Sequence, residues 1–363
     1  MVTTMASERC TTSGLTRRRF VGTMAASATV LGLRAGNASS STSDAKQRGR
    51  EVPRRIPTVC GRVAPGDLGR VLAHEHVICS SAEFKLAFGR KWLPREKVVD
   101  VAVARLKYVK ERHHVGTVVD GTTPALGRDL DLLKELSEKS GVHIVATTGF
   151  YHYPSLTIQT LDPRTLAEMF IDEVAEHGIG QLKCAVDAGG VQPHHRRAFE
   201  CLARVQKATG LPLYVHTYAQ EKNGLAILEA FKDYGIPPDR VVLGHAADTD
   251  DVAYLRELLK RGVRLSVDRI YATWFTGKAA SLTALIKEGF GGQLLLSHDV
   301  TLAWDSNVHG RGRPVEKSWG HVHSFDNCLG IVFEKVLPIL RANGISEAQI
   351  DTMLVANPAE LWI

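Results

Sequence analysis

The chain has 363 residues, of which 44% are hydrophobic and 23% charged, with a formal net charge of +6. This composition is typical of a folded globular protein and excludes a chain that stays disordered. No stretch approaches the ~20 consecutive apolar residues of a membrane helix, so we expect no membrane span. The length fits one large α/β barrel or two ordinary domains.

Residues 1–38 have the pattern of an export signal. The arginines Arg17–Arg19 precede Phe20 and an apolar run from Val21 to Leu33, and the small residues Gly36 and Ala38 follow. Basic, apolar and small residues in this order indicate a cleavable signal, and the paired arginines favour the twin-arginine route. We predict cleavage after Ala38 and export to the cell envelope, the periplasm or the medium. A basic amphipathic arm is the alternative.

The segment that follows, residues 39–56, is rich in serine and then in lysine and arginine, which predicts a disordered linker before a folded domain over residues 57–363. Cleavage after Ala38 removes five arginines and one glutamate and lowers the net charge from +6 to +2. No basic, aromatic-interleaved patch remains, so we expect no nucleic-acid partner. Five cysteines without a C-x-x-C pair indicate free thiols rather than a disulfide framework.

Eight short apolar runs, rich in β-branched residues, predict strands. They are Val71–Ile78, Thr117–Gly121, His143–Thr147, Gln181–Ala185, Pro212–His216, Val241–His245, Arg264–Asp268 and Gln293–Asp299. Between them lie amphipathic segments that predict helices, several ending on glycine. These are Arg95–His114, Arg128–Lys139, Arg164–His177, Arg196–Thr209, Gly224–Tyr234, Asp250–Arg261 and Ala279–Glu288.

Eight strand-helix units of about thirty residues predict the α/β class and a closed (β/α)8 TIM barrel. No glycine-rich turn follows the first strand, which disfavours a dinucleotide-binding sheet. After the eighth strand we expect a loop over Asp305–Pro314 and a closing helix over Phe325–Leu340.

Barrel enzymes carry their chemistry at the carboxyl ends of the strands, and here those ends carry metal-ligand residue types. His74 and His76 end the first strand, where alternate side chains share a face, so both point into the barrel while Glu75 points away. Four further strands end on a histidine, an aspartate or a lysine, and imidazole and carboxylate are ligands that borderline divalent metals prefer. The four residues are Lys183, His216, His245 and Asp299.

Each of these residues also has an ordinary structural interpretation. A single histidine at a strand end is more often a core or surface residue than a ligand, and Asp299 alone could cap a helix. Lys183 could pair with a carboxylate, but an unpaired ammonium among its apolar neighbours would be costly. Five strand ends together favour a metal site.

Several motifs carry a resemblance to a known family. They are His74-Glu75-His76, Gln181-Leu182-Lys183, Val215-His216-Thr217, Gly244-His245 with Asp248-Thr249-Asp250-Asp251, Asp268-Arg269 and Ser297-His298-Asp299. In content and order they resemble the phosphotriesterase family of the amidohydrolase superfamily, from about Gly61 to Leu361.

This resemblance implies an amidohydrolase-type barrel with two divalent metal ions, zinc first, with cobalt, manganese or iron as alternatives. It implies that Lys183 is an N6-carboxylysine that bridges both ions. His216 and His245 are then further ligands of one ion, and His74, His76 and Asp299 are further ligands of the other. A desolvated amine is neutral enough to take up carbon dioxide, and two cations stabilise the resulting carbamate.

The resemblance also assigns catalytic roles. A hydroxide shared by the metals attacks the substrate, Asp299 accepts its proton, and Asp248 relays that proton outward. Tyr151 lies in an aromatic wall whose phenol donates a hydrogen bond, and Arg269, with the short segment after it, is similar to the lactonase branch.

The expected substrate is therefore a small-molecule lactone or related ester, with promiscuous action on organophosphate triesters. Tyr153 belongs to the same aromatic wall as Tyr151. The candidates for an apolar acyl pocket are Trp274, Trp304 and Trp319, although ordinary loop packing explains these tryptophans equally well. The segment Val300-Thr301-Leu302 departs from the lactonase pattern, which leaves the leaving-group pocket open.

Two other interpretations stay open. One is a dedicated phosphotriesterase, or another amidohydrolase acting on an ester or amide. The other, from a different class, is a metal-bearing barrel that only binds a ligand, against which the six-residue ligand set argues. The oligomeric state is undetermined, with a homodimer as one option.

Overall fold

A computed structural model describes residues 55–92, 95–152, 155–270, 275–304 and 328–362. The predicted signal over residues 1–38 and nearly all of the predicted linker lie outside these residues, so both stay predictions. The same holds for Tyr153, Trp274, Trp319 and the loop over Asp305–Pro314. Within the described part of the chain, none of the helices combines the length and apolar character that a membrane crossing needs.

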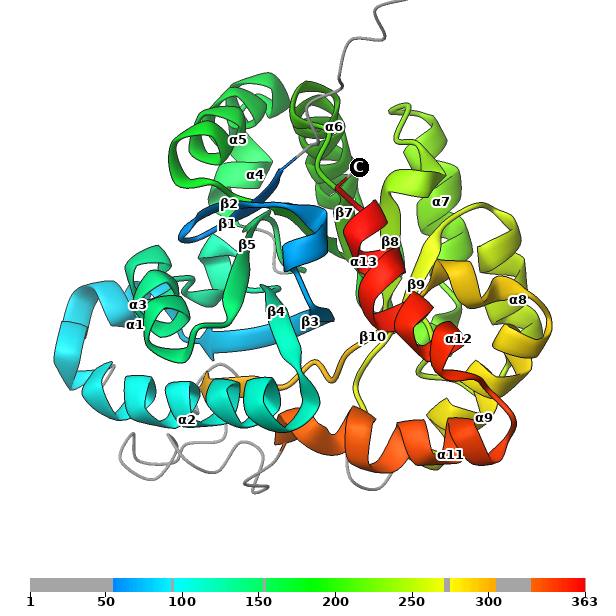
Figure 1. Cartoon of the computed structure of the whole chain (residues 1–363). Coiled ribbons are helices and arrows are strands. Elements are labelled where there is room, and N and C mark those ends of the chain that lie inside the picture. Colours follow the sequence, from blue (N-terminus) through cyan, green and yellow to red (C-terminus); the bar gives the residue numbers. More distant parts are fainter. Residues whose placement is uncertain (1–54, 93–94, 153–154, 271–274, 305–327, 363) are drawn as a thin grey trace, which may run out of the picture. The chain divides into compact units, whose positions relative to one another are not determined.

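The centre of the fold is a curled sheet of parallel strands, ordered β10-β9-β8-β7-β6-β5-β4-β3-β11, with helices around it (Figure 1). This confirms the predicted (β/α)8 barrel, and all eight predicted strands form. Their bounds are β3 (Arg70–Cys79), β4 (Val115–Asp120), β5 (His143–Gly149), β6 (Gln181–Ala185), β7 (Leu213–His216), β8 (Val241–Gly244), β9 (Arg264–Val267) and β10 (Leu294–Leu296), followed by β11 (Thr301–Trp304).

The eighth barrel strand differs from its prediction because it is split. Its first half, β10, pairs with β9, and its second half, β11, pairs with β3. The residues between the halves also bond to β3: Asp299 N donates to His74 O at 3.1 Å, and His76 N donates to Val300 O at 2.9 Å. The split strand therefore joins the last strand of the barrel to the first, and it does so beside the predicted ligands.

The seven predicted helices form, with ends shifted by a few residues. They are α2 (Arg95–His113), α3 (Leu130–Ser140), α5 (Pro163–His177), α6 (Pro193–Thr209), α7 (Gly224–Lys232), α8 (Val252–Lys260) and α9 (Phe275–Lys287). Capping fixes these ends: the Asp129 carboxylate accepts from Leu132 N at 2.9 Å, and Gly141 ends α3 with a φ of 69°. Two short helices, α1 (Ala82–Phe88) and α4 (Leu156–Thr160), were not predicted.

The predicted closing helix is more irregular than expected. Its described part begins with a 3-10 turn at Cys328–Gly330, continues as a π-helix over Val332–Val336 and ends as α11 (Leu337–Ala342). Two short helices, α12 (Glu347–Asp351) and α13 (Asn357–Glu360), follow, with a second π-helical segment at Thr352–Ala356 between them.

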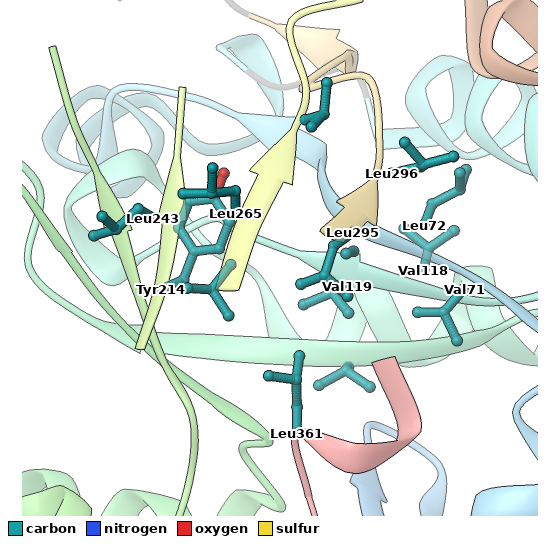
Figure 2. Close-up of a cluster of buried hydrophobic side chains, with 14 of the residues drawn as sticks. Val71, Leu72, Val118, Val119, Tyr214, Leu243, Leu265, Leu295, Leu296 and Leu361 are labelled. Carbon is teal, nitrogen blue, oxygen red and sulfur yellow. The ribbon is translucent and has the colours of Figure 1, made fainter. Parts of the chain in front are cut away.

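The amino end of the barrel is filled and covered. Leucine and valine side chains from its strands pack there with Tyr214 and with Leu361 from the chain end (Figure 2). The hairpin of β1 (Ile56–Thr58) and β2 (Gly61–Val63) lies against β5, and Trp362 Nε1 donates to Gly180 O at 2.7 Å. Because this end is closed by side chains, the opposite end is where a substrate can enter.

Candidate metal centre

The three predicted ligands His74, His76 and Asp299 meet at the carboxyl end of the barrel. Both histidines lie on β3, and the Nε2 atom of each is 3.4 Å from Asp299 Oδ1. The three donor atoms lie within 4.8 Å of one another and form a group that could hold a metal ion. His74 is fully buried and His76 nearly so, which keeps water from competing for their nitrogens.

Lys183 on β6 reaches the same group from the barrel interior. Its side chain is fully buried, and Nζ lies 3.0 Å from Gly121 O and 3.3 Å from His74 Nε2. Burial lowers the pKa of Lys183 from 10.5 to about 8, because an ammonium loses its hydration there. The neutral amine is therefore far more abundant near pH 7 than in an exposed lysine.

His216 and His245 lie beside this group, at the ends of the next two strands. Their ring centroids are 4.4 Å apart, and that of His245 is 5.6 Å from that of His74. Asp268 Oδ1 receives His245 Nδ1 at 2.8 Å, which leaves the other ring nitrogen for a ligand. With these two residues, all six predicted ligands converge on one site.

Buried polar groups fix the orientation of the histidines. His76 Nδ1 bonds to Thr122 Oγ1 at 2.9 Å, and that hydroxyl donates to Asp120 Oδ1 at 2.9 Å. Asp120 also accepts Val77 N at 2.7 Å, so one carboxylate holds both the strand and the imidazole. Gly121 is required next to it, since a Cβ there would lie 2.2 Å from His74 Cε1.

Glu75 points away from the mouth, as predicted, and connects β3 to the split eighth strand. Its buried carboxylate accepts Ser297 Oγ at 2.7 Å, His298 N at 2.9 Å, His298 Nδ1 at 2.8 Å and Val300 N at 2.8 Å. Ser297 Oγ in turn accepts His74 N at 2.8 Å. This group, the Glu75 network, sets the position of Asp299 relative to the two histidines of β3.

Three site residues hold a left-handed backbone, which costs free energy in residues other than glycine. The φ angles are 63° at His245, 49° at Arg269 and 57° at Asp299, each just after a strand. The turn that this conformation makes aims each side chain across the mouth. Backbone strain of this kind is common at functional sites.

Arg269 joins two of the predicted catalytic residues. Its Nε donates to Asp299 Oδ2 at 3.2 Å, and its Nη1 donates to Asp248 Oδ2 at 3.1 Å. Asp248 also accepts Lys278 Nζ from α9 at 2.5 Å. The connection between Asp299 and Asp248 therefore runs through the guanidinium. Sequence reasoning missed Lys278, although its helix neighbours Ala279, Leu282 and Leu285 are apolar and buried.

Tyr151 lies where the sequence placed it, on the wall of the site after β5. Its ring centroid is 5.8 Å from Lys183 Nζ and 5.8 Å from the ring of His216. Burial, and secondarily the charge of Asp299, raises the pKa of Tyr151, so the phenol keeps its proton and can act as a donor. Asp187, which sequence reasoning missed, lies 3.8 Å from His216 Nε2 on the same wall.

The charges of three members of this donor set, His74, His216 and Asp299, suit divalent cations. Burial and the neighbouring Lys183 hold the pKa of His74 well below 6.5, and burial and His245 do the same for His216, so both imidazoles are neutral. Although burial opposes it, His245 and His74 hold the pKa of Asp299 well below 3.8. Two ligands at ~2.1 Å from one tetrahedral ion lie roughly 3.4 Å apart, which matches both imidazole–Asp299 separations.

A parallel (β/α)8 barrel with buried imidazoles, a buried lysine and a carboxylate at its open end defines a metal-dependent barrel enzyme. Comparison with known proteins then gives the family. The phosphotriesterase family profile matches residues 54–362, and the chain belongs to that family.

Curated relatives agree with this assignment. A phosphotriesterase homology protein of Mycobacterium tuberculosis is 31% identical over 326 residues, covering 85% of this chain and 97% of the relative. An aryldialkylphosphatase of Saccharolobus solfataricus is 26% identical, covering 85% and 99%, and an N-acetyltaurine hydrolase of Tetraodon nigroviridis is 25% identical, covering 85% and 97%. The chain is thus a metal-dependent hydrolase of a family that uses two metal ions.

Proposed function

We propose that this protein hydrolyses lactones or related carboxylic esters, with promiscuous activity toward organophosphate triesters. The observation that carries hydrolysis is the convergence of His74, His76 and Asp299 with Lys183 at the open end of the barrel. The ester preference rests on Arg269, which follows Asp268 as in the lactonase branch and contacts Asp299.

The six donors, five of them buried, would hold two divalent ions, zinc first, with cobalt, manganese or iron as alternatives. We propose that the neutral Lys183 Nζ adds to the carbon of carbon dioxide and releases one proton, which yields a carbamate with two oxygens to share. When bound, the ions supply Lewis acidity and make water acidic enough to ionise near neutral pH. The carbamate and Asp299 offset part of their positive charge.

The side chains around this centre position the substrate and move the proton. Asp299, at the centre of the donor set, accepts the proton of the attacking water. Arg269 keeps its own proton, since guanidinium pKa values exceed ~12, so it fixes the carboxylates of Asp299 and Asp248 and does not carry the proton. The Tyr151 phenol donates a hydrogen bond to an oxygen of the substrate.

Parallel kinetics on a series of lactones and on an aryl phosphotriester, with equal metal loading, test this function. We expect kcat/KM for the best lactone to exceed that for the phosphotriester. The reverse order would establish a dedicated phosphotriesterase, and turnover of N-acyl amides alone would establish an amidohydrolase. No turnover of any of these substrates by metal-loaded protein would favour a barrel that only binds a ligand.

Replacing Arg269 tests the arrangement of the two carboxylates. We expect Arg269→Met to lower kcat/KM about 10²-fold, the usual scale for losing a positioned acid-base arrangement, while metal content stays unchanged. Arg256→Met is the matched control, because Arg256 pairs with Glu288 on the outer surface. Loss of metal from the Arg269 variant, or equal activity in both variants, would contradict this role.

A further inference from the structure

Tyr214 lies directly beneath the candidate metal centre. It is on β7, two residues before His216, so both side chains point into the barrel. Its side chain is 1% exposed and belongs to the buried cluster drawn in Figure 2. The phenol ring stacks on the imidazole of His74, with centroids 3.9 Å apart and planes at 13°.

The hydroxyl of Tyr214 contacts a second part of the centre. It donates to Asp268 Oδ2 at 2.5 Å, and the other oxygen of Asp268 accepts His245 Nδ1 at 2.8 Å and His245 N at 3.2 Å. Tyr214, Asp268 and His245 are all buried, so water offers no substitute partner for any of them. The orientation of the His245 ring thus depends on a carboxylate that the phenol holds in place.

The surrounding backbone is shaped to fit this hydroxyl. A Cβ at position 244 would lie 1.8 Å from Tyr214 Oη, so only glycine is accommodated before His245. Lys183 Nζ lies 5.4 Å from the centroid of the Tyr214 ring, so the ring is also close to a third predicted ligand. These contacts are specific to a tyrosine, since phenylalanine lacks the donor and leucine lacks the flat face.

We propose that Tyr214 is a positioning residue that orients ligands of both metal ions, its ring face acting on His74 and its hydroxyl acting through Asp268 on His245. This inference rests on the two-metal centre proposed above. It follows that the ring affects the ion held by His74, whereas the hydroxyl affects the ion held by His245. A single tyrosine in the floor of the barrel thereby links two sets of ligands that come from distant parts of the chain.

Metal content and release test the proposal on the purified, zinc-loaded protein, with zinc per chain measured by mass spectrometry and release followed with a chromogenic chelator. Tyr214→Phe keeps the ring and loses the hydroxyl, so we expect one of two zinc ions to leave on the order of 10-fold faster, the usual cost of losing a group that orients a ligand. The other ion keeps its parental release rate. Tyr214→Leu is expected to speed the release of both.

Two further variants make the result specific. Tyr254→Phe is the matched control, because its buried hydroxyl accepts Gly224 N at 3.2 Å on the outer helix layer, and we expect parental release of both ions. Asp268→Ala removes the carboxylate that joins Tyr214 to His245 and should reproduce the single fast ion, even if Tyr214→Phe does not fold.

If both ions left the Tyr214→Phe variant at the parental rate, or if both left equally faster, the role of Tyr214 would be overturned. The proposed hydrolase function would remain intact. A parent protein that binds no zinc would instead overturn the two-metal centre, and this inference with it.

Discussion

Lys183→Ala is expected to reduce the metal content from about two ions per chain to less than one, because the proposed carbamate is the ligand that the ions share. The buried Lys183 side chain reaches the donor set, since Nζ contacts His74 Nε2 at 3.3 Å and Gly121 O at 3.0 Å, and alanine cannot span that distance. Metal contributes several kcal/mol to such reactions, so we expect esterase activity to fall roughly 10³-fold or more.

Metal analysis of the parent and the variant, combined with carbon NMR after labelling with ¹³C-bicarbonate, checks this expectation. The parent should show one carbamate signal that the variant lacks. Lys278→Ala is the matched control, because it removes another buried ammonium, one that contacts Asp248 and lies outside the ligand set. Full metal content in the Lys183 variant would refute the bridging role.

Glu75→Gln is expected to destabilise the whole barrel while leaving every predicted ligand in place. Whichever carboxylate oxygen the amide nitrogen replaces, it would face donors: Val300 N at Oε2, or Ser297 Oγ and His298 Nδ1 at Oε1. Leaving buried donors without acceptors next to a lost charge costs about 3 kcal/mol or more. For a chain of this size, this corresponds to a melting temperature roughly 6 °C lower.

Thermal unfolding of the metal-free protein measures this effect without a contribution from bound ions. Glu288→Gln serves as control: this carboxylate is exposed, pairs with Arg256 on the surface and should change the midpoint little. A Glu75 variant as stable as the control would mean that the network does not hold the barrel closed.

The barrel and the ligand set could be predicted because both depend on local rules. Alternating side chains on a strand place His74 and His76 on one face, and parallel strands bring all their carboxyl ends to one edge. The structure follows both rules, and the predicted β6 over Gln181–Ala185 needed no correction.

The missed features of the site depend on partners that are distant in sequence. The eighth strand divides because Glu75, from the first strand, binds the backbone and side chains between its halves. Lys278 has an ordinary place on a helix until the fold brings it to Asp248. In the strand pattern Tyr214 is one more buried aromatic residue, and only the assembled barrel shows it between His74 and Asp268.

The split eighth strand also bears on when the protein can acquire its ions. Asp299 and the Glu75 network come together only after the last barrel strand has docked on the first. A partly synthesised chain therefore exposes scattered histidines but no complete binding site. We therefore expect metal capture to follow closure of the barrel, so that the supply of ions acts on the folded protein.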